Sequence, residues 1–189
     1  MSWMIAGLGN PGPEYTRTRH NAGFLVIDSL GEDLSAAYWK NEAGALTSSA
    51  VLDGDSLLLV KPLTYMNVSG KAIAKLAAKY EYAVDRIVVV HDDIDIPNGS
   101  LRVKAGGGHA GHNGLRSITD ELGSEGYIRV RIGVGRPEGR MSGADYVLQP
   151  LRGEAWEDLQ VSIGQAAECV KHLLAHGVDS AMREFNSKQ

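Results

Sequence analysis

The sequence is poor in several features that define other classes of protein. It contains one cysteine, Cys169, so no intramolecular disulfide can form and a reduced, cytoplasmic setting is expected. No run of 18 apolar residues occurs, so no membrane span is expected. The first residues lack the basic segment of a signal peptide, and their short apolar run is better explained as a strand.

Positive charge is also scarce. The chain has 19 Lys and Arg against 23 Asp and Glu, and this net charge of −4 argues against a protein that coats nucleic acid with its whole surface. Between Ser100 and Arg140, however, the sequence has seven basic residues and only four acidic ones, so a local basic patch could hold an anionic ligand. The 43% hydrophobic content of the 189 residues is enough for one domain, residues 1–189, with a substantial core.

Apolar periodicity predicts that strands and helices alternate along the chain. Strands are expected at residues 3–8, 46–52, 56–61, 86–90, 101–104 and 127–134, the second and third forming a hairpin. Helices are expected after residues 21, 70 and 114, and on the stripe Leu159, Ile163, Ala166, Val170 and Leu173, with Gly177 as its cap. Residues 135–149, which are rich in Gly and Arg, are expected to form a mobile loop. The pattern predicts an α/β fold, a single domain with a mixed, mostly parallel twisted sheet flanked by helices.

The stretch from Lys104 to Gly114 has an unusual composition, with five glycines, two histidines and one asparagine in eleven residues. Glycines at this density let backbone N–H groups face a ligand, and the helix expected next offers further N–H groups to an oxyanion or phosphate. Asn113 is expected at the N-cap, where its side chain either caps the helix or faces a ligand. A flexible surface loop would also explain the glycines, but the histidines and Lys104 favour a site.

Five polar residues each lie just after a predicted strand or just before a predicted helix: Asn10, His20, Asn67, Asp92 and Asn113. Such positions meet at the carboxyl edge of an open α/β sheet. A histidine base, an aspartate that fixes its tautomer, and amides that position water and polarise a carbonyl would suit hydrolysis. Taken singly, each residue also has a structural explanation as a turn, cap, loop or surface residue.

Longer motifs run in order along nearly the whole chain: Gly7–Gly12, Tyr15, Thr18–Gly23, Lys61–Gly70, His91-Asp92, Gly106–Gly114 and Arg131–Pro137. Together they resemble the bacterial-type peptidyl-tRNA hydrolase family. The resemblance implies an enzyme that hydrolyses the ester between a peptide and the 3′-terminal ribose of tRNA, releasing stalled peptidyl-tRNA for reuse. It also implies a cytoplasmic monomer that needs no metal or other cofactor. The first motif reads Gly-Leu-Gly-Asn where other members have Gly-Leu-Ala-Asn, which is a mild departure.

The resemblance also implies roles for individual residues. His20 would be the general base and Asp92 its partner. Asn10 and Asn113 would join them as catalytic residues, and with Asn67 they would bind the peptide backbone or the attacking water. The other substrate-binding residues would be Met66, Tyr65, Gly111, His112 and Tyr15, the last packing near the ester. On the tRNA side, Lys104 and Arg131 would hold the 5′-phosphate at the acceptor end, and Arg140 would add a basic contact.

Two other classes of function remain open. A metal hydrolase could use His91, Asp92, Asp93, His109 and His112, although the sequence lacks a His-Glu-x-x-His motif. A non-catalytic RNA-binding module would not need a histidine, an aspartate and three asparagines at one edge. A covalent nucleophile is not expected, because no Gly-x-Ser-x-Gly motif occurs and a buried Cys169 would be a poor thiolate.

Overall fold

The protein forms a seven-stranded mixed sheet with the strand order β2-β3-β4-β1-β5-β7-β6. The computed structural model describes residues 2–187, so residue 1 and residues 188–189 of the predicted domain lie outside the described part. The strands are β1 (Trp3–Gly7), β2 (Lys40–Glu42), β3 (Ala45–Leu52), β4 (Asp55–Pro62), β5 (Ile87–Asp93), β6 (Leu101–Ala105) and β7 (Ile128–Gly133). The centre β4-β1-β5-β7 is parallel, and the pairs β2-β3, β3-β4 and β6-β7 are antiparallel. The predicted α/β fold with a mixed sheet and a parallel centre is confirmed.

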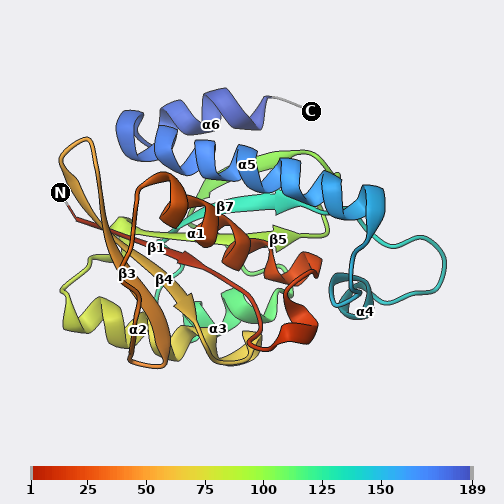
Figure 1. The fold of residues 1–189 in the computed structure, drawn as a ribbon, viewed down its shortest axis with the longest axis horizontal. Helices are drawn as coiled ribbons and strands as arrows, with labels where there is room; N and C mark the ends of the chain where they lie inside the picture. Colours follow the sequence, from red (N-terminus) through yellow and green to blue (C-terminus); the bar gives the residue numbers. More distant parts are fainter. Residues whose placement is uncertain (1, 188–189) are drawn as a thin grey trace.

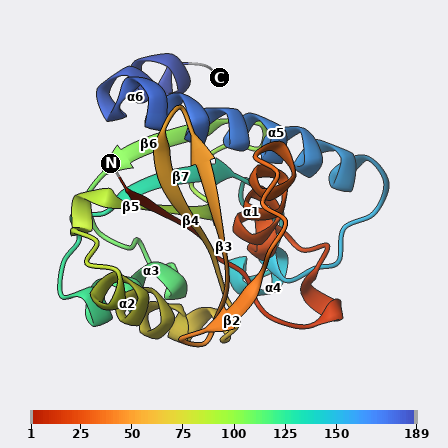
Figure 2. The same cartoon turned by 60° about the vertical axis from the view of Figure 1, so that its left-hand side comes forward.

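Helices cover both faces of the sheet (Figure 1). On one face lie α1 (Ala22–Asp33) and α5 (Gly153–His176), and on the other lie α2 (Ser69–Lys79) and α3 (Asn113–Leu122). Figure 2 shows α2 and α3 together on the side of the sheet opposite α5. Strands β1 and β5 are buried almost throughout because both faces carry a hydrophobic core, which explains their continuous apolar sequences.

One strand and two α-helices were not predicted. The edge strand β2 has the polar sequence Lys-Asn-Glu and no apolar alternation, so it forms only because β3 pairs with it. Helix α4 (Gly143–Val147) lies inside residues 135–149, so the prediction of a loop there is wrong for these five residues. The third element is α6 (Val178–Asn186), which begins directly after Gly177.

Gly177 ends α5 as predicted. Its φ of 89° lies in the left-handed region that glycine adopts without strain, and this lets the chain turn sharply from α5 into α6. Helix α6 then packs beside the edge strand β6.

No helix among residues 2–187 combines the length and the apolar character that crossing a bilayer requires.

Candidate active site

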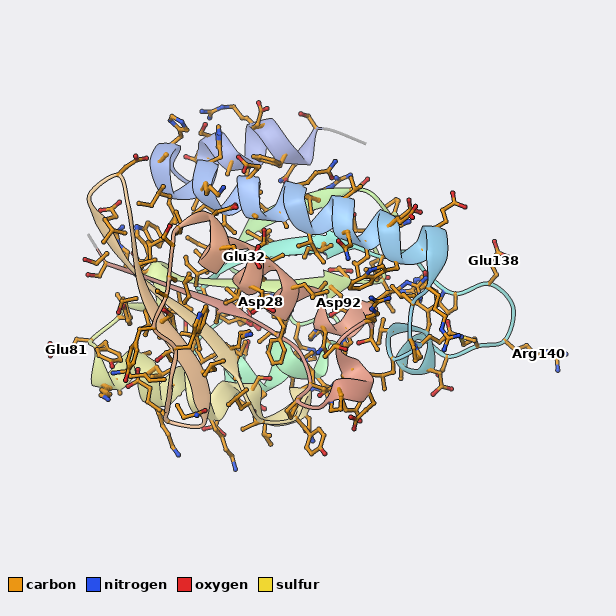
Figure 3. The ribbon with its side chains drawn as sticks, viewed as in Figure 1. Asp28, Glu32, Glu81, Asp92, Glu138 and Arg140 are labelled. Carbon is orange, nitrogen blue, oxygen red and sulfur yellow. The ribbon has the colours of Figure 1, made fainter. Side chains whose placement is uncertain are left out.

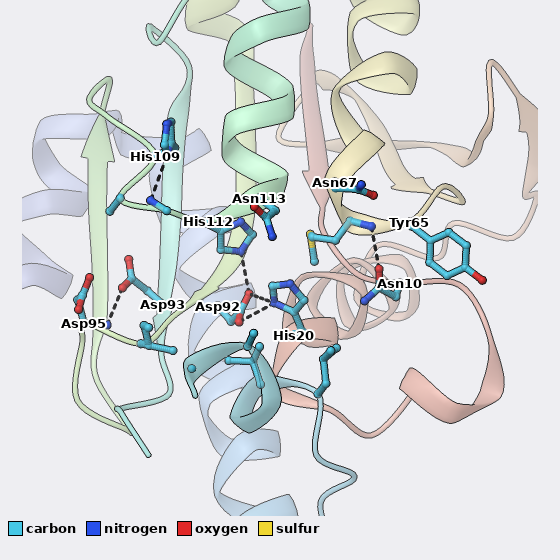
Figure 4. A pocket seen from close by; sticks show the side chains of 18 residues that line it. Asn10, His20, Tyr65, Asn67, Asp92, Asp93, Asp95, His109, His112 and Asn113 are labelled. Atoms are coloured by element: carbon cyan, nitrogen blue, oxygen red, sulfur yellow. Dashed lines mark hydrogen bonds and ion pairs between the residues drawn. The ribbon is translucent and has the colours of Figure 1, made fainter. Parts of the chain in front are cut away.

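A cavity of about 380 Å³ opens at the carboxyl ends of the central strands. Most of the predicted catalytic and substrate-binding residues line it: Asn10, His20, Tyr65, Met66, Asn67, Asp92, Gly111, His112 and Asn113 (Figure 4). Tyr15, Lys104, Arg131 and Arg140 lie outside its lining. The parallel centre of the sheet therefore gathers side chains that are up to about a hundred residues apart in the sequence, as the topology rule for open α/β sheets predicts.

His20 and Asp92 form the polar centre of this cavity. The Nδ1 atom of His20 lies 3.0 and 2.9 Å from the two carboxylate oxygens of Asp92. Burial alone would lower the pKa of His20, but the negative charge and the hydrogen bond of Asp92 outweigh it, so this pKa is raised. Burial would likewise raise the pKa of Asp92, but the two histidines beside it hold that pKa well below its ordinary value. Neutral His20 donates its Nδ1–H to Asp92 in a hydrogen bond. Its Nε2 atom therefore keeps a lone pair that can accept a proton.

Close backbone packing brings His20 to Asp92. His20 lies in a 3₁₀ turn, Arg19–Asn21, directly before α1. A Cβ atom on Gly23 would lie 2.3 Å from the backbone nitrogen of Leu8 and 2.4 Å from the carbonyl oxygen of Val90. Only glycine fits there, so the start of α1 sits directly on β1 and β5, one turn from His20.

His112 caps α3, and the expectation that Asn113 would be the N-cap is wrong. The Nδ1 atom of His112 accepts from the backbone N–H groups of Gly114 and Leu115, at 3.1 and 3.3 Å. Its Nε2 atom lies 3.0 Å from Oδ1 of Asp92. Because Nδ1 is an acceptor, the proton must be on Nε2, where it is donated to Asp92. Asn113 is instead the first residue of α3, exposed at the edge of the cavity.

Asn10 is fixed by two neighbours. Its side-chain oxygen accepts from the backbone N–H of Met66 at 2.7 Å. Asn21 bonds the backbone N–H and C=O of Asn10, at 2.9 and 3.0 Å. With its oxygen occupied, the side chain of Asn10 has its amino group to offer to a ligand. The prediction did not include Asn21, although it lies inside the Thr18–Gly23 motif.

His91 supports the other side of Asp92. Its Nδ1–H donates to the backbone oxygen of Asp92 at 2.7 Å, and its ring packs edge-on against His112, with 4.9 Å between centroids. Burial is the main cause that lowers the pKa of His91 to about 3, so this imidazole is neutral at physiological pH. Its Nε2 atom is buried and has no hydrogen-bond partner among the described residues.

Arg129 holds the glycine stretch through hydrogen bonds to its backbone. Sequence reasoning did not identify this residue as part of the site. Arg129 is buried, and its guanidinium donates to the backbone oxygens of Gly107 and Gly108. The neighbouring strand β6 places Lys104 directly opposite Arg129. Arg131 follows two residues later, so Lys104 and Arg131 lie on the same face of the β6-β7 pair, in diagonal register. Arg140 lies at the tip of the loop before α4, away from Asp92 (Figure 3).

One group of three potential metal ligands occurs among residues 2–187, and it consists of His20, Asp92 and His112. It shares Asp92 and His112 with the set considered for a metal hydrolase. His91 and His109 of that set have other partners: His91 bonds the backbone oxygen of Asp92, and the Nδ1 atom of His109 accepts from Gly111 at 3.0 Å.

Comparisons with known proteins agree with the fold and the motifs. The model of the family described as peptidyl-tRNA hydrolase matches residues 4–189. Curated peptidyl-tRNA hydrolases include one from Nocardia farcinica, 46% identical over 97% of this chain and 95% of its own. Another, from Moorella thermoacetica, is 45% identical over 97% of both chains. The crystal structure of peptidyl-tRNA hydrolase from Acinetobacter baumannii superposes with a TM-score of 0.91 at 34% identity, covering 99% of this chain and 95% of that one. Since the family model spans nearly the whole sequence and these relatives align end to end, the chain belongs to the peptidyl-tRNA hydrolase family.

Proposed function

We propose that the protein hydrolyses the ester between peptide and tRNA in peptidyl-tRNA and releases both products without a metal ion or other cofactor. In this proposal residues 1–189 act as one domain and as a cytoplasmic monomer that serves translation by rescuing stalled peptidyl-tRNA. The observation that carries the proposal is the bond of His20 Nδ1 to buried Asp92, at 2.9 Å, in a cavity lined by asparagine amides. Family membership supplies the substrate class.

The reaction follows from the hydrogen bonds of His20. Its Nε2 atom accepts a proton from water as the water oxygen attacks the ester carbonyl, and Asp92 stabilises the resulting imidazolium. When the tetrahedral intermediate collapses, the carbonyl–ribose oxygen bond breaks and the imidazolium returns the proton to the departing ribose oxygen. An aminoacyl-type ester is activated enough for this to proceed without a covalent nucleophile.

The asparagines supply amide groups around the same centre. In this scheme the amino groups of Asn10 and Asn113 position the water or stabilise the oxyanion, and one such donor contributes roughly 3–4 kcal/mol in favourable cases. Asn67 binds the peptide backbone. The remaining predicted substrate-binding residues line the groove for the peptide or pack near the ester: Tyr15, Tyr65, Met66, Gly111 and His112.

The cations of the β6-β7 pair would bind the tRNA. Lys104 and Arg131 share one face of the pair, in diagonal register, so together they could clamp the 5′-phosphate at the acceptor end. Arg140, at the tip of its loop, would contact the nucleic acid further away.

Replacing His20 tests the proposal. His20→Ala should lower kcat on N-acetylated aminoacyl-tRNA by at least about 10²-fold, because general base catalysis usually contributes that much. Binding of the tRNA should change little. A matched control is His176→Ala, which removes an exposed histidine at the end of α5. Near-normal kcat in a folded His20→Ala protein would show that this histidine is not the base.

A metal-dependent hydrolase is the second candidate, because His20, Asp92 and His112 are grouped closely enough to hold an ion. The two candidates differ in their response to a chelator. Turnover that persists after exhaustive dialysis against a chelator supports the metal-independent reaction, and turnover that vanishes and returns with a divalent cation supports the other.

A further inference from the structure

Asp93 lies next to the proposed catalytic aspartate and lines the same cavity, but its carboxylate has different hydrogen-bond partners. Side chains alternate along a strand, so Asp92 and Asp93 at the end of β5 point to opposite faces of the sheet. Asp92 meets His20 and His112, whereas Asp93 meets Arg131 on the neighbouring strand β7. Two adjacent residues therefore contact different parts of the proposed machinery: Asp92 binds the proposed base, and Asp93 binds Arg131, a proposed phosphate-binding residue.

The carboxylate of Asp93 is fixed at both oxygens. Its Oδ1 accepts from the backbone N–H of Asp95 at 2.8 Å, and its Oδ2 accepts from Nε of Arg131 at 3.0 Å. Its backbone oxygen also accepts from the N–H of Val134 at 3.1 Å. The side chain of Asp93 is only 11% exposed, so this pair differs from a solvated surface ion pair, which would contribute little.

The bond to Asp93 uses the Nε atom of the Arg131 guanidinium and leaves the two terminal amino groups available. Nε is the only atom of the Arg131 side chain that a described residue binds, and this side chain is 26% exposed. The two terminal amino groups form the fork with which arginine binds a phosphate through two parallel hydrogen bonds. Lys104, on the same face, adds a point charge.

We propose that Asp93 is a positioning residue for phosphate recognition: it holds Arg131 by Nε so that both terminal amino groups face a phosphate of the substrate. This inference rests on the proposed function, in which Arg131 binds the 5′-phosphate of tRNA. In this role Asp93 acts on the phosphate through Arg131, to which it is bonded. It reduces the side-chain freedom that Arg131 would otherwise lose on binding.

The test compares kcat/KM on N-acetylated aminoacyl-tRNA with and without its 5′-phosphate, and the ratio of the two values defines the phosphate preference. In Asp93→Ser the hydroxyl can still accept from the N–H of Asp95, as serine does in local turns, but it is too short to hold Arg131. The preference should fall by about 3- to 10-fold, through KM for the phosphorylated substrate. Asp93→Asn keeps an oxygen for Nε and should retain most of the preference.

The two variants separate position from charge. If Asp93 acted only as a negative charge that repels the phosphate, both variants would bind phosphorylated tRNA more tightly and the preference would rise in each. That result would overturn the inference, and so would an unchanged preference in Asp93→Ser. In an Arg131→Ala background, Asp93→Ser should change the preference no further, because the two residues act as one unit.

Further measurements keep this inference distinct from the proposed function. Both variants should keep the wild-type kcat and the acidic limb of its pH profile, and a shifted limb would mean that Asp93 acts through Asp92 instead. Asp33→Ala, which removes a carboxylate paired with Lys171 between α1 and α5, controls for net charge. A wild-type protein without turnover contradicts the proposed function. Turnover without any phosphate preference leaves the hydrolase intact but overturns the role of Asp93.

Discussion

At the scale of single residues, two histidines of the cavity bind the carboxylate of Asp92 through different ring nitrogens. The Nδ1 atom of His112 accepts from the backbone of α3, and its Nε2 proton is donated to Asp92. His20 bonds Asp92 through Nδ1 alone, so it can gain and lose a proton at Nε2. Asp92 therefore holds one ring fixed and supports the charge change of the other.

The pH profile should report the pairing of His20 with Asp92. The pKa of His20 is raised by Asp92, and a base works only when neutral, so activity is lost as the pH falls through that pKa. Asp92→Asn removes the charge, so the acidic limb of kcat/KM should move to lower pH and the plateau should fall. Asp93→Asn, which removes the adjacent carboxylate from the other face, is the control and should leave the limb in place. An unshifted limb in Asp92→Asn would rule out the pairing.

His91 should make the protein less stable in mild acid. Its pKa is about 3 in the folded protein and near 6.5 when unfolded, so between these values the unfolded chain binds more protons. The free energy of unfolding should therefore fall as the pH is lowered from 6.5 to 4.5. In His91→Asn, which keeps a donor, this slope should be smaller. Urea unfolding of both proteins across the range measures it, and equal slopes would show that His91 is protonated in the folded state.

At the scale of elements, two of the helices beside the cavity, α3 and α4, begin with a side-chain cap. His112 caps α3, and Ser142 caps the short helix α4 by accepting from the N–H of Asp145 at 3.1 Å. Four residues of or beside α4 form one wall of the cavity: Gly143, Ala144, Val147 and Leu148. These two N-caps therefore help to shape the site as well as fixing where α3 and α4 begin.

Replacing His112 should separate its two bonds. His112→Ala loses both the cap and the bond to Asp92, and the free energy of unfolding should fall by about 1–2 kcal/mol. Asparagine is a good N-cap but is too short to reach Asp92 as well, so His112→Asn should recover most of the stability without restoring full kcat. Chemical denaturation and turnover measured on the same preparations test this. Equal stability of the two variants would mean that the histidine contributes nothing as a cap.

At the scale of the whole molecule, the sheet separates two hydrophobic cores, and one exposed edge needs protection. The edge strand β6 presents backbone groups that could pair with another strand. Asn186 on α6 occupies two of them, because its Oδ1 accepts from the N–H of Val103 at 2.7 Å and its Nδ2 donates to the oxygen of Val103 at 3.0 Å. The C-terminal helix thus takes the place of a neighbouring strand.

Asn186→Ala should loosen this contact. Loss of two hydrogen bonds should lower the free energy of unfolding by about 1–3 kcal/mol, and the amide of Val103 should exchange with solvent faster. Hydrogen exchange resolved by residue measures this directly. Ser187→Ala, which removes a hydroxyl bonded to the oxygen of Arg183 within the same helix end, is the control. Unchanged protection of Val103 in Asn186→Ala would show that α6 does not guard the edge.

Local sequence determined much of the fold. The continuous apolar runs of β1 and β5 predicted strands, and Gly177 could be assigned as a cap because glycine adopts its left-handed φ without strain. The order of the motifs indicated the family. The positions of Asn10, His20 and Asp92 at strand and helix ends also indicated one edge of the sheet, since parallel strands bring such ends together.

Tertiary structure decided whatever depends on partners distant in the sequence. Asparagine is the commoner N-cap, yet His112 caps α3, in a geometry where Asp92 from β5 also binds its ring. The alternation around Arg129 showed a strand but not that the glycine stretch would fold over its guanidinium. Strand β2 exists only through β3, and Asn186 meets Val103 across 83 residues of sequence. The physical reason is common to all of these: periodicity and propensity are local, whereas a hydrogen bond between distant segments exists only once the chain has folded.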